Sequence, residues 1–178
     1  MMGKKLGIGP LEWIYWNRVL IHSEKETSFE RKKSLMNSKA YELQLTSEEN
    51  NLTELLSFVK ERLAEAGYSL KMQRQIATAA EEVFVNIAHY AYEPEIGPVR
   101  VGMELNDTPN AVTLTFADSG MPFNPLEKQD PDVSLPGEER EIGGLGIFMT
   151  KMIMDEMTYE YSNGQNILSM KKCFGEGD

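Results

Sequence analysis

The chain of 178 residues is 41% hydrophobic and 26% charged, which is the composition of one globular domain with a sizeable core. Its net charge of −10 argues against direct binding of a nucleic-acid backbone, which needs a basic surface. The single cysteine, Cys173, excludes an internal disulfide and a cysteine-based metal cluster, and it favours a reducing, cytoplasmic location.

The first part of the chain differs in character from the rest. Residues 1–38 predict an N-terminal extension, and residues 39–175 predict the domain proper. One hypothesis is that translation begins at Met36 and that the upstream part is an appendage. A second is that Trp13, Trp16 and Leu20 form a helical contact with a partner chain. No apolar run approaches the roughly 18 residues of a membrane span, so no membrane insertion is expected.

The first predicted elements of the domain are a strand and two helices. Residues 40–45 alternate apolar and polar side chains, which is typical of a half-buried strand. Thr46 and Glu49 fit a capping box at the start of a helix, and Gly67 fits its C-terminal cap. A second helix is expected over residues 70–92, which contain no glycine or proline.

The second half of the domain reads as strands around one further helix. Residues 99–105 and 112–116 predict a β-hairpin, and residues 121–142 predict a long irregular loop. A glycine-rich segment then opens a helix, and Asn163-Gly164 joins the last two strands in a hairpin. The order of elements predicts an α+β two-layer sandwich, with a mostly antiparallel mixed sheet and helices on one face.

Three short segments carry candidate chemistry, and the first lies on the second helix. Glu82 and Asn86 are four residues apart, so their side chains lie one above the other beside the apolar stripe. A carboxylate and a carboxamide at the rim of a core can hold a metal ion and accept a proton. The same spacing is more often a pair of solvated side chains. His89, one turn further on, is expected to be a surface or packed histidine.

The second segment is Asp118-Ser119-Gly120, at the end of a predicted core strand. A buried carboxylate there would accept a hydrogen bond from an amine on a flat ligand, and the glycine would allow close approach. The alternative is an ordinary turn, which Asp and Gly also favour.

The third segment is Gly143-Gly144-Leu145-Gly146, at a predicted helix start. Unpaired backbone N–H groups at such a start attract phosphate, although a flexible loop end has the same sequence. The segment lacks the lysine of the common phosphate-binding loop, so a P-loop NTPase is excluded.

Together, these segments resemble the GHKL (Bergerat-fold) ATP-binding domains, and within them the anti-sigma-factor serine/threonine kinases of bacteria. The resemblance covers about residues 40–173. The matching residues are Glu82-x-x-x-Asn86 with Ala91-Tyr92, then Asp118-Ser119-Gly120-Met121-Pro122-Phe123, then Gly143-Gly144-Leu145-Gly146-Ile147.

The resemblance implies ATP and Mg²⁺ as ligands and gives the matching residues roles. Asn86 would coordinate Mg²⁺ through its side-chain oxygen. Asp118 would accept a hydrogen bond from the adenine amino group, and Gly120 would lie against the base. Glu82 would be the general base that takes a proton from the attacking hydroxyl.

The resemblance also implies a phosphate site under a lid. Gly144 and Gly146 would present N–H groups to the phosphates, inside a lid formed by about residues 124–145. Arg140, just before the glycines, would pair with the terminal phosphate.

The activity implied is that of an ATP-dependent protein serine/threonine kinase. It would phosphorylate a serine on an anti-anti-sigma (STAS-type) protein, sequester a sigma factor, and work as a cytoplasmic homodimer. The alternative is an ATP-gated protein-binding module of the same fold without phosphotransfer. A stand-alone ATPase like those of chaperones or topoisomerases is disfavoured, because 178 residues leave no room for their transducing domains.

The sequence departs from the family pattern at two places. The family often has a histidine four residues after the helix asparagine. In this chain that position is Tyr90, and His89 lies one residue earlier, so no role is carried over to His89. The last strand often carries a threonine near the adenine, but here Gly164 is followed by Gln165 and Asn166. The adenine contact from this strand is therefore left open.

Overall fold

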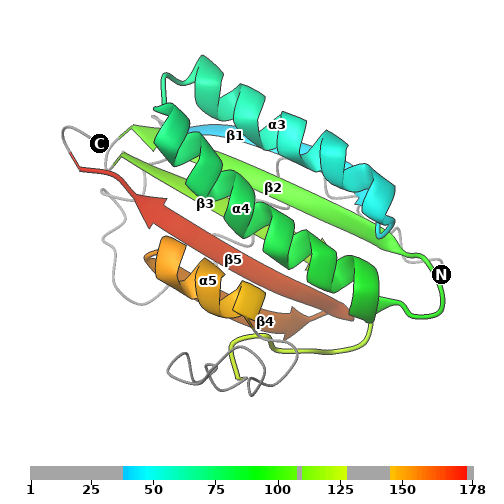
Figure 1. The fold of residues 1–178 in the computed structure, drawn as a ribbon. Helices are drawn as coiled ribbons and strands as arrows, with labels where there is room; N and C mark the ends of the chain where they lie inside the picture. The colour runs from blue at the N-terminus through cyan, green and yellow to red at the C-terminus, as the bar shows by residue number, and fades with distance from the viewer. Residues whose placement is uncertain (1–37, 108–109, 128–144, 176–178) are drawn as a thin grey trace, which may run out of the picture.

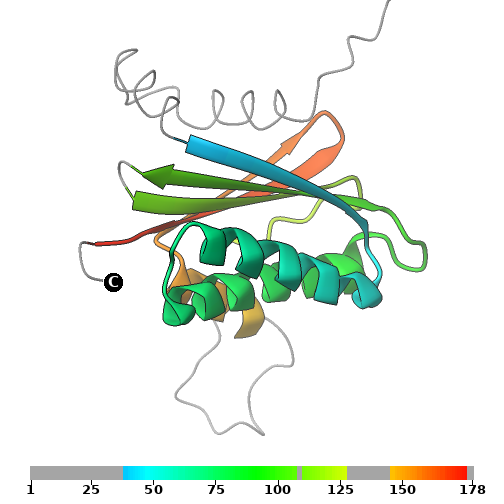
Figure 2. The same ribbon diagram turned by 90° about the horizontal axis from the view of Figure 1, so that it is seen from above.

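The computed structural model describes residues 38–107, 110–127 and 145–175. Within these ranges the chain forms a two-layer α+β fold, whose five strands lie in the order β1-β2-β3-β5-β4 (Figure 1). Figure 2 shows the helices packed together on one face of this sheet. The predicted fold class and the order of elements are confirmed. Each strand pairing in the described sheet is antiparallel, so it is more regular than the mixed sheet we expected.

The bounds of the elements lie close to those predicted. The strands are β1 (Ser38–Thr46), β2 (Pro98–Asp107), β3 (Asn110–Asp118), β4 (Glu156–Ser162) and β5 (Gln165–Cys173). The helical segments are the 3-10 turn η1 (Glu49–Asn51), α3 (Leu52–Glu65), α4 (Leu70–Asn86), the π-helical turn η2 (Ile87–Ala91) and α5 (Leu145–Ile153).

The helix-facing side of the central strands carries the core of the sheet. Leu114 on β3 pairs with Met170 on β5, and both side chains are fully buried. Because successive side chains point to opposite faces of a strand, Asp118 and Asn166, each four residues away, face the same side. These two polar residues pair with each other where β3 ends and β5 has just begun. The alternation therefore places a polar pair at the end of an apolar row.

Helices α3 and α4 each bury one apolar stripe in the same core. On α3 the buried residues recur at intervals of four: Leu55, Val59 and Leu63. On α4 they are Met72, Ile76, Ala77, Ala79, Ala80, Val83 and Phe84. The turn between the helices uses Gly67 with a φ of +83°, and the Ser69 hydroxyl caps α4 by accepting a hydrogen bond from the Met72 N–H at 3.3 Å.

The start of the first helix differs from the prediction. Thr46 and Glu49 do not form a capping box; the Thr46 hydroxyl instead donates to Glu48 Oε2 at 2.6 Å. Asn51 Nδ2 in turn donates to Thr46 Oγ1 at 2.8 Å. These short-range bonds hold a 3-10 turn, η1, before α3 begins, because they engage the threonine oxygen that would otherwise cap the helix.

The predicted second helix changes its pitch before it ends. Regular α4 stops at Asn86, and residues 87–91 continue as a π-helical turn. The predicted hairpin between β4 and β5 is confirmed, because Asn163 and Gly164 have φ angles of +53° and +78°, as a two-residue type I′ turn requires. The predicted extension covers residues 1–38, of which 1–37 lie outside the described residues, so the boundary at 38/39 stays a prediction.

Candidate active site

The C-terminal half of α4 carries the first two predicted site residues. Glu82 and Asn86 lie on one side of the helix and are half-buried. Asn86 Nδ2 donates to the backbone carbonyl of Glu82 at 2.7 Å, which folds the carboxamide against its own helix. Because the nitrogen is engaged in this way, the side-chain oxygen of Asn86 is the atom available to a ligand.

The start of α5 lies against Glu82. A Cβ atom at Gly146 would overlap the carboxylate of Glu82, so these two residues are in direct contact as the sequence stands. The buried Thr150 hydroxyl donates to the carbonyl of Gly146 at 2.9 Å and anchors this first turn. The structure thus brings Gly146 and Glu82 together. Gly144 and Arg140 lie outside the described residues.

Asp118 closes β3 as a buried carboxylate, with 5% of its surface exposed. Its Oδ1 accepts hydrogen bonds from Asn166 Nδ2 at 2.8 Å and from the Gly120 N–H at 2.9 Å. Burial raises the pKa of the Asp118 carboxyl above its usual value, and these two hydrogen bonds oppose the rise in part. With Oδ1 engaged, Oδ2 is the oxygen that can accept from a bound molecule.

Gly120 is small for a structural reason that the sequence did not reveal. A side chain there would collide with the backbone carbonyl of Ala91 in η2. The neighbouring Met121 N–H donates to the same carbonyl at 2.9 Å. The loop after β3 is therefore fastened to the end of the α4 helix, and the predicted contact of Gly120 with a base is not tested by this packing.

Tyr92 reinforces the same junction. Its hydroxyl accepts from the Ser119 N–H at 2.6 Å and donates to the Pro98 carbonyl at 2.7 Å. Its ring lies so close to Gly97 that a Cβ atom there would overlap it. One tyrosine therefore ties the loop after β3 to the start of β2.

Asn166 is the residue that sequence reasoning missed. It is 6% exposed, and besides Asp118 it bonds the loop after β3: Nδ2 donates to the Met121 carbonyl at 3.0 Å, and Oδ1 accepts from the Phe123 N–H at 3.1 Å. Oδ1 also accepts from the Tyr159 hydroxyl at 2.7 Å. The departure from the family threonine was the available signal, because a buried asparagine needs partners for both ends of its amide.

His89 does not join Glu82 and Asn86. Its Nε2 contacts Glu49 Oε1 on η1, and both side chains are largely exposed. The interpretation as a surface histidine is confirmed. This contact links η1 to η2 at the surface of the molecule. Among the described residues, no histidine therefore lies at the candidate site.

The predicted segments therefore converge on one stretch of helix. Gly146 contacts α4 at Glu82, and the loop after β3 contacts η2 at Ala91. These two contacts are separated by about 13 Å along the helix at 1.5 Å per residue, and Asn86 lies between them. An elongated ligand with a flat amine-bearing end at Asp118 and an anionic end at Gly146 fits this layout.

The residues at the site also fit a magnesium ion that is carried by a phosphate ligand. The described residues hold no cluster of three or more His, Cys, Asp or Glu side chains that could bind a metal without a ligand. Asn86 offers one neutral oxygen with its amide nitrogen engaged elsewhere. Mg²⁺ commonly takes one or two protein oxygens and completes its shell with phosphates and water.

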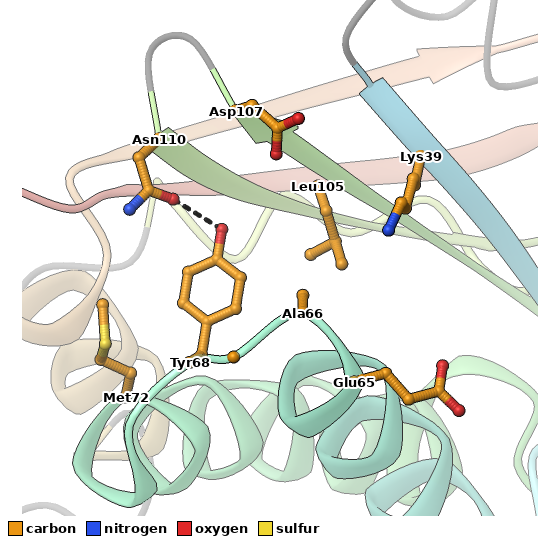
Figure 3. A pocket seen from close by; sticks show the side chains of 9 residues that line it. Lys39, Glu65, Ala66, Tyr68, Met72, Leu105, Asp107 and Asn110 are labelled. Carbon is orange, nitrogen blue, oxygen red and sulfur yellow. Dashed lines mark hydrogen bonds between the residues drawn. The ribbon is translucent and has the colours of Figure 1, made fainter.

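A separate hollow of about 430 Å³ lies at the opposite end of the sheet (Figure 3). It is lined by Lys39, Glu65, Ala66, Gly67, Tyr68, Met72, Leu105, Asp107 and Asn110. The Tyr68 hydroxyl donates to Asn110 Oδ1 at 2.8 Å beside it. Because Asn110 opens β3 and Asp118 closes it, roughly 27 Å of strand at 3.4 Å per residue separates this hollow from the candidate site.

Comparison with known proteins identifies the family of this chain. A family model described as a histidine kinase-like ATPase domain matches residues 45–172. The chain belongs to this family. The matched range contains α4, the end of β3 and the start of α5, and it confirms the resemblance that the sequence carried. Membership makes ATP the expected ligand of this domain.

Curated relatives in this ATPase family are named as protein kinases. The chain is 24% identical over 135 residues to the serine/threonine-protein kinase BtrW of Bordetella bronchiseptica, a match that covers 76% of this chain and 94% of that protein. It is 28% identical over 109 residues to the serine-protein kinase RsbW of Bacillus thuringiensis, covering 59% of this chain and 67% of that protein. The predicted kinase-type ATPase domain is confirmed by these matches.

A solved structure shares the fold. The fold matches a chain in the crystal structure of the RsbU and RsbW domains of Rv1364c from Mycobacterium tuberculosis with a TM-score of 0.54 and 16% identity. The match covers 75% of this chain and 32% of that larger chain, and at this identity it supports the fold alone. In the described ranges, no helix combines the length and apolar character that crossing a membrane requires.

Proposed function

We propose that this chain is an ATP-dependent protein serine/threonine kinase that acts as an anti-sigma regulatory factor. The observation that carries the proposal is the position of Glu82. Its carboxylate lies against Gly146 at a helix start and one turn from Asn86. A base placed between a phosphate-binding helix start and a magnesium ligand is the arrangement that phosphoryl transfer to a hydroxyl needs.

The chemistry follows from these positions. Glu82 accepts the proton of the attacking serine hydroxyl while the serine oxygen forms a bond to the terminal phosphorus of ATP. The bond from that phosphorus to the bridging oxygen breaks, and ADP leaves with the electron pair. Mg²⁺ held by the side-chain oxygen of Asn86 would offset the negative charge of the phosphates. The N–H groups at the start of α5 contact the transferred group; Gly144 and Arg140 are predicted to add to them.

The partners are proposed on the resemblance and on the names of the relatives. The acceptor is a serine on an anti-anti-sigma (STAS-type) protein, and the second partner is a sigma factor that the kinase sequesters. RsbW and BtrW are both named as kinases that act on serine or on serine and threonine. The proposal includes a homodimer in the cytoplasm and excludes direct contact with nucleic acid, in line with the net charge of −10.

A pull-down from the source bacterium in the presence of ATP, followed by phosphosite mapping of the captured STAS-type protein, tests the partner. The role of Glu82 is tested by Glu82→Gln, which keeps the shape of the side chain and removes the base. We expect ATP affinity to be kept and the transfer rate to fall by roughly two to four orders of magnitude.

Glu81→Gln is the matched control, because Glu81 is also half-buried but lies on a different side of α4. It should transfer phosphate at the normal rate. Normal turnover in Glu82→Gln would rule out Glu82 as the base. A wild-type chain that binds ATP and its partner but never transfers phosphate would instead establish the ATP-gated binding module.

A further inference from the structure

Asn166 uses its whole side-chain amide in contacts with the protein. A carboxamide can donate two hydrogen bonds and accept two. In the described part of the chain, Nδ2 donates to Asp118 and Met121, and Oδ1 accepts from Phe123 and Tyr159. With both donors and both acceptor positions engaged, Asn166 has no remaining capacity for a ligand. It therefore acts on a ligand through Asp118.

The orientation of this amide is fixed by its neighbours. Its nitrogen faces a carboxylate and a carbonyl, and its oxygen faces an N–H and a hydroxyl. Turning the amide over would set its oxygen against the Asp118 carboxylate and its NH₂ against the Phe123 N–H. The amide consequently always presents a donor to Asp118.

This donor determines what Asp118 can recognise. Oδ1 is engaged by Asn166 and by the Gly120 N–H, so Oδ2 faces the ligand. Hydrogen bonds to the ionised carboxylate favour that form, and an ionised carboxylate only accepts. It can accept from the exocyclic amine of a 6-aminopurine, and it repels the carbonyl oxygen that a 6-oxopurine carries at the same position.

We propose that Asn166 is a positioning residue that sets the choice of a 6-aminopurine over a 6-oxopurine nucleotide, by holding Asp118 as a pure acceptor. The proposal rests on the proposed function, because it takes the ligand to be a purine nucleotide whose base lies at Asp118. It adds a specificity determinant on β5, in the stretch Gln165-Asn166 where the resemblance left the adenine contact open.

The test compares binding of ATP and inosine triphosphate, which differ in the substituent at position 6 of the base and in the proton that N1 of the 6-oxopurine carries with it. Asn166→Asp keeps the shape of the side chain and its two acceptor contacts, but it replaces the donor to Asp118 by an oxygen. Binding is measured at the alkaline limit of folding, where a proton shared between the two carboxyl groups is lost. We expect ATP affinity to fall by roughly ten- to hundredfold and the preference for ATP to be largely lost. Asn166→Asp that is folded and keeps the wild-type ratio of affinities would overturn the proposal.

Tyr159→Phe is the matched control, because it removes one bond to the oxygen of Asn166 and leaves the donor face intact. Its ratio of affinities should stay that of the wild type, even if its melting temperature falls. If Tyr159→Phe lowers the ratio as much as Asn166→Asp, the effect is general loosening of the hairpin and the proposal is wrong.

A second pair decides the matter if Asn166→Asp does not fold. Asn166→Thr and Asn166→Val have almost the same shape and both suit a strand, but only threonine can donate to Asp118. We expect Asn166→Thr to retain a preference for ATP and Asn166→Val to lose it; equal ratios in the two variants would overturn the proposal. A wild-type chain that binds neither nucleotide contradicts the proposed function, whereas one that binds both equally contradicts only this inference.

Discussion

Gly146 at the start of α5 lies directly against the carboxylate of Glu82 on α4. Any side chain at position 146 would occupy the space of that carboxylate. The Glu82 carboxylate is the far end of a flexible side chain, so it can move aside without disturbing the fold. That movement would, however, take the carboxylate out of its catalytic position. This contact gives the glycine a role beyond the exposure of its backbone N–H to a phosphate.

Gly146→Ala is expected to displace the carboxylate of Glu82 while leaving the fold intact. We expect the phosphotransfer rate to fall by roughly a hundredfold, because small misplacements of a reacting group are costly. The melting temperature should change little. Met149→Ala, an exposed position on the same helix, is the control and should retain the rate. Single-turnover kinetics separate the two cases, and an unimpaired Gly146→Ala would mean that Glu82 is not held by this contact.

Gly120→Ala should damage both stability and nucleotide binding. Its new methyl group meets the backbone carbonyl of Ala91, which cannot move without distorting η2. We expect a loss of about 1–3 kcal/mol in the free energy of unfolding, as for other overpacked sites. Chemical denaturation measures this loss, and calorimetry measures the weaker binding of ATP.

Gly67→Ala is a useful contrast to Gly120→Ala. Space is open around Gly67, but its φ of +83° strains an alanine. A destabilisation of about 1–2 kcal/mol is expected from the backbone alone. Because Gly67 lies at the other end of α4, the affinity for ATP should not change. A loss of affinity in this variant would show that binding follows global stability.

Asn86→Ala should remove the dependence of ATP binding on Mg²⁺. The oxygen of this carboxamide is the one left free by its bond to the Glu82 carbonyl. We expect Mg²⁺-supported affinity for ATP to fall at least about tenfold, with affinity in EDTA unchanged. Arg74→Ala, on the exposed side of α4, is the control. Calorimetry that gives equal Mg²⁺ effects in the wild type and Asn86→Ala would refute the metal assignment.

The pH dependence of ATP binding should reveal Asp118. Its pKa is raised above 3.8 by burial, and the amine of adenine needs the ionised form. Affinity is therefore full at neutral pH and falls as the pH drops through the raised pKa, earlier than for an exposed aspartate. The sign is opposite for folding: because the pKa of Asp118 is raised above 3.8, protonated Asp118 favours the folded state, and this contribution is lost as the pH rises through the raised pKa.

Titration of the phosphates is the main interference in that experiment, and inosine triphosphate controls for it because it carries the same phosphates. The ratio of the two affinities should fall toward acid pH in the wild type. In Asp118→Asn the part of this dependence that comes from the carboxylate should be lost, and any remaining dependence reports protonation of the adenine ring. A wild-type ratio that is constant down to the acid limit of folding would exclude Asp118 as the group that reads the base.

The parts of the site that local patterns specify were predictable from the sequence. Glu82 and Asn86 share a helix face because of the helical repeat, and the two-residue turn at Asn163-Gly164 follows from backbone preferences. The convergence of α4 with the start of α5 came from the family resemblance. The helix face and the turn depended on spacing within single segments, which a sequence displays directly.

The parts that depend on long-range contacts were not predictable. Asn166 was visible only as a departure from the family threonine, because its partners come from β3, β4 and the loop between β3 and α5. The close packing of Gly120 on the carbonyl of Ala91 also joins distant parts of the chain, and the predicted contact of Gly120 with a base stays a prediction. Thr46 was assigned to a capping box, but its hydroxyl found the nearer Glu48.

The tight turn at Asn163-Gly164 has a consequence for which changes in chain length this protein can tolerate. Asn166 lies only two residues after that turn, and the register of the strands pairs it with Asp118. One inserted or deleted residue there that shifted β5 by a single step would point Asn166 at the outer surface of the sheet. Base recognition would then be lost although every helix stayed in place. Insertions in this short connection should therefore be as harmful as substitutions of the residues that contact the nucleotide.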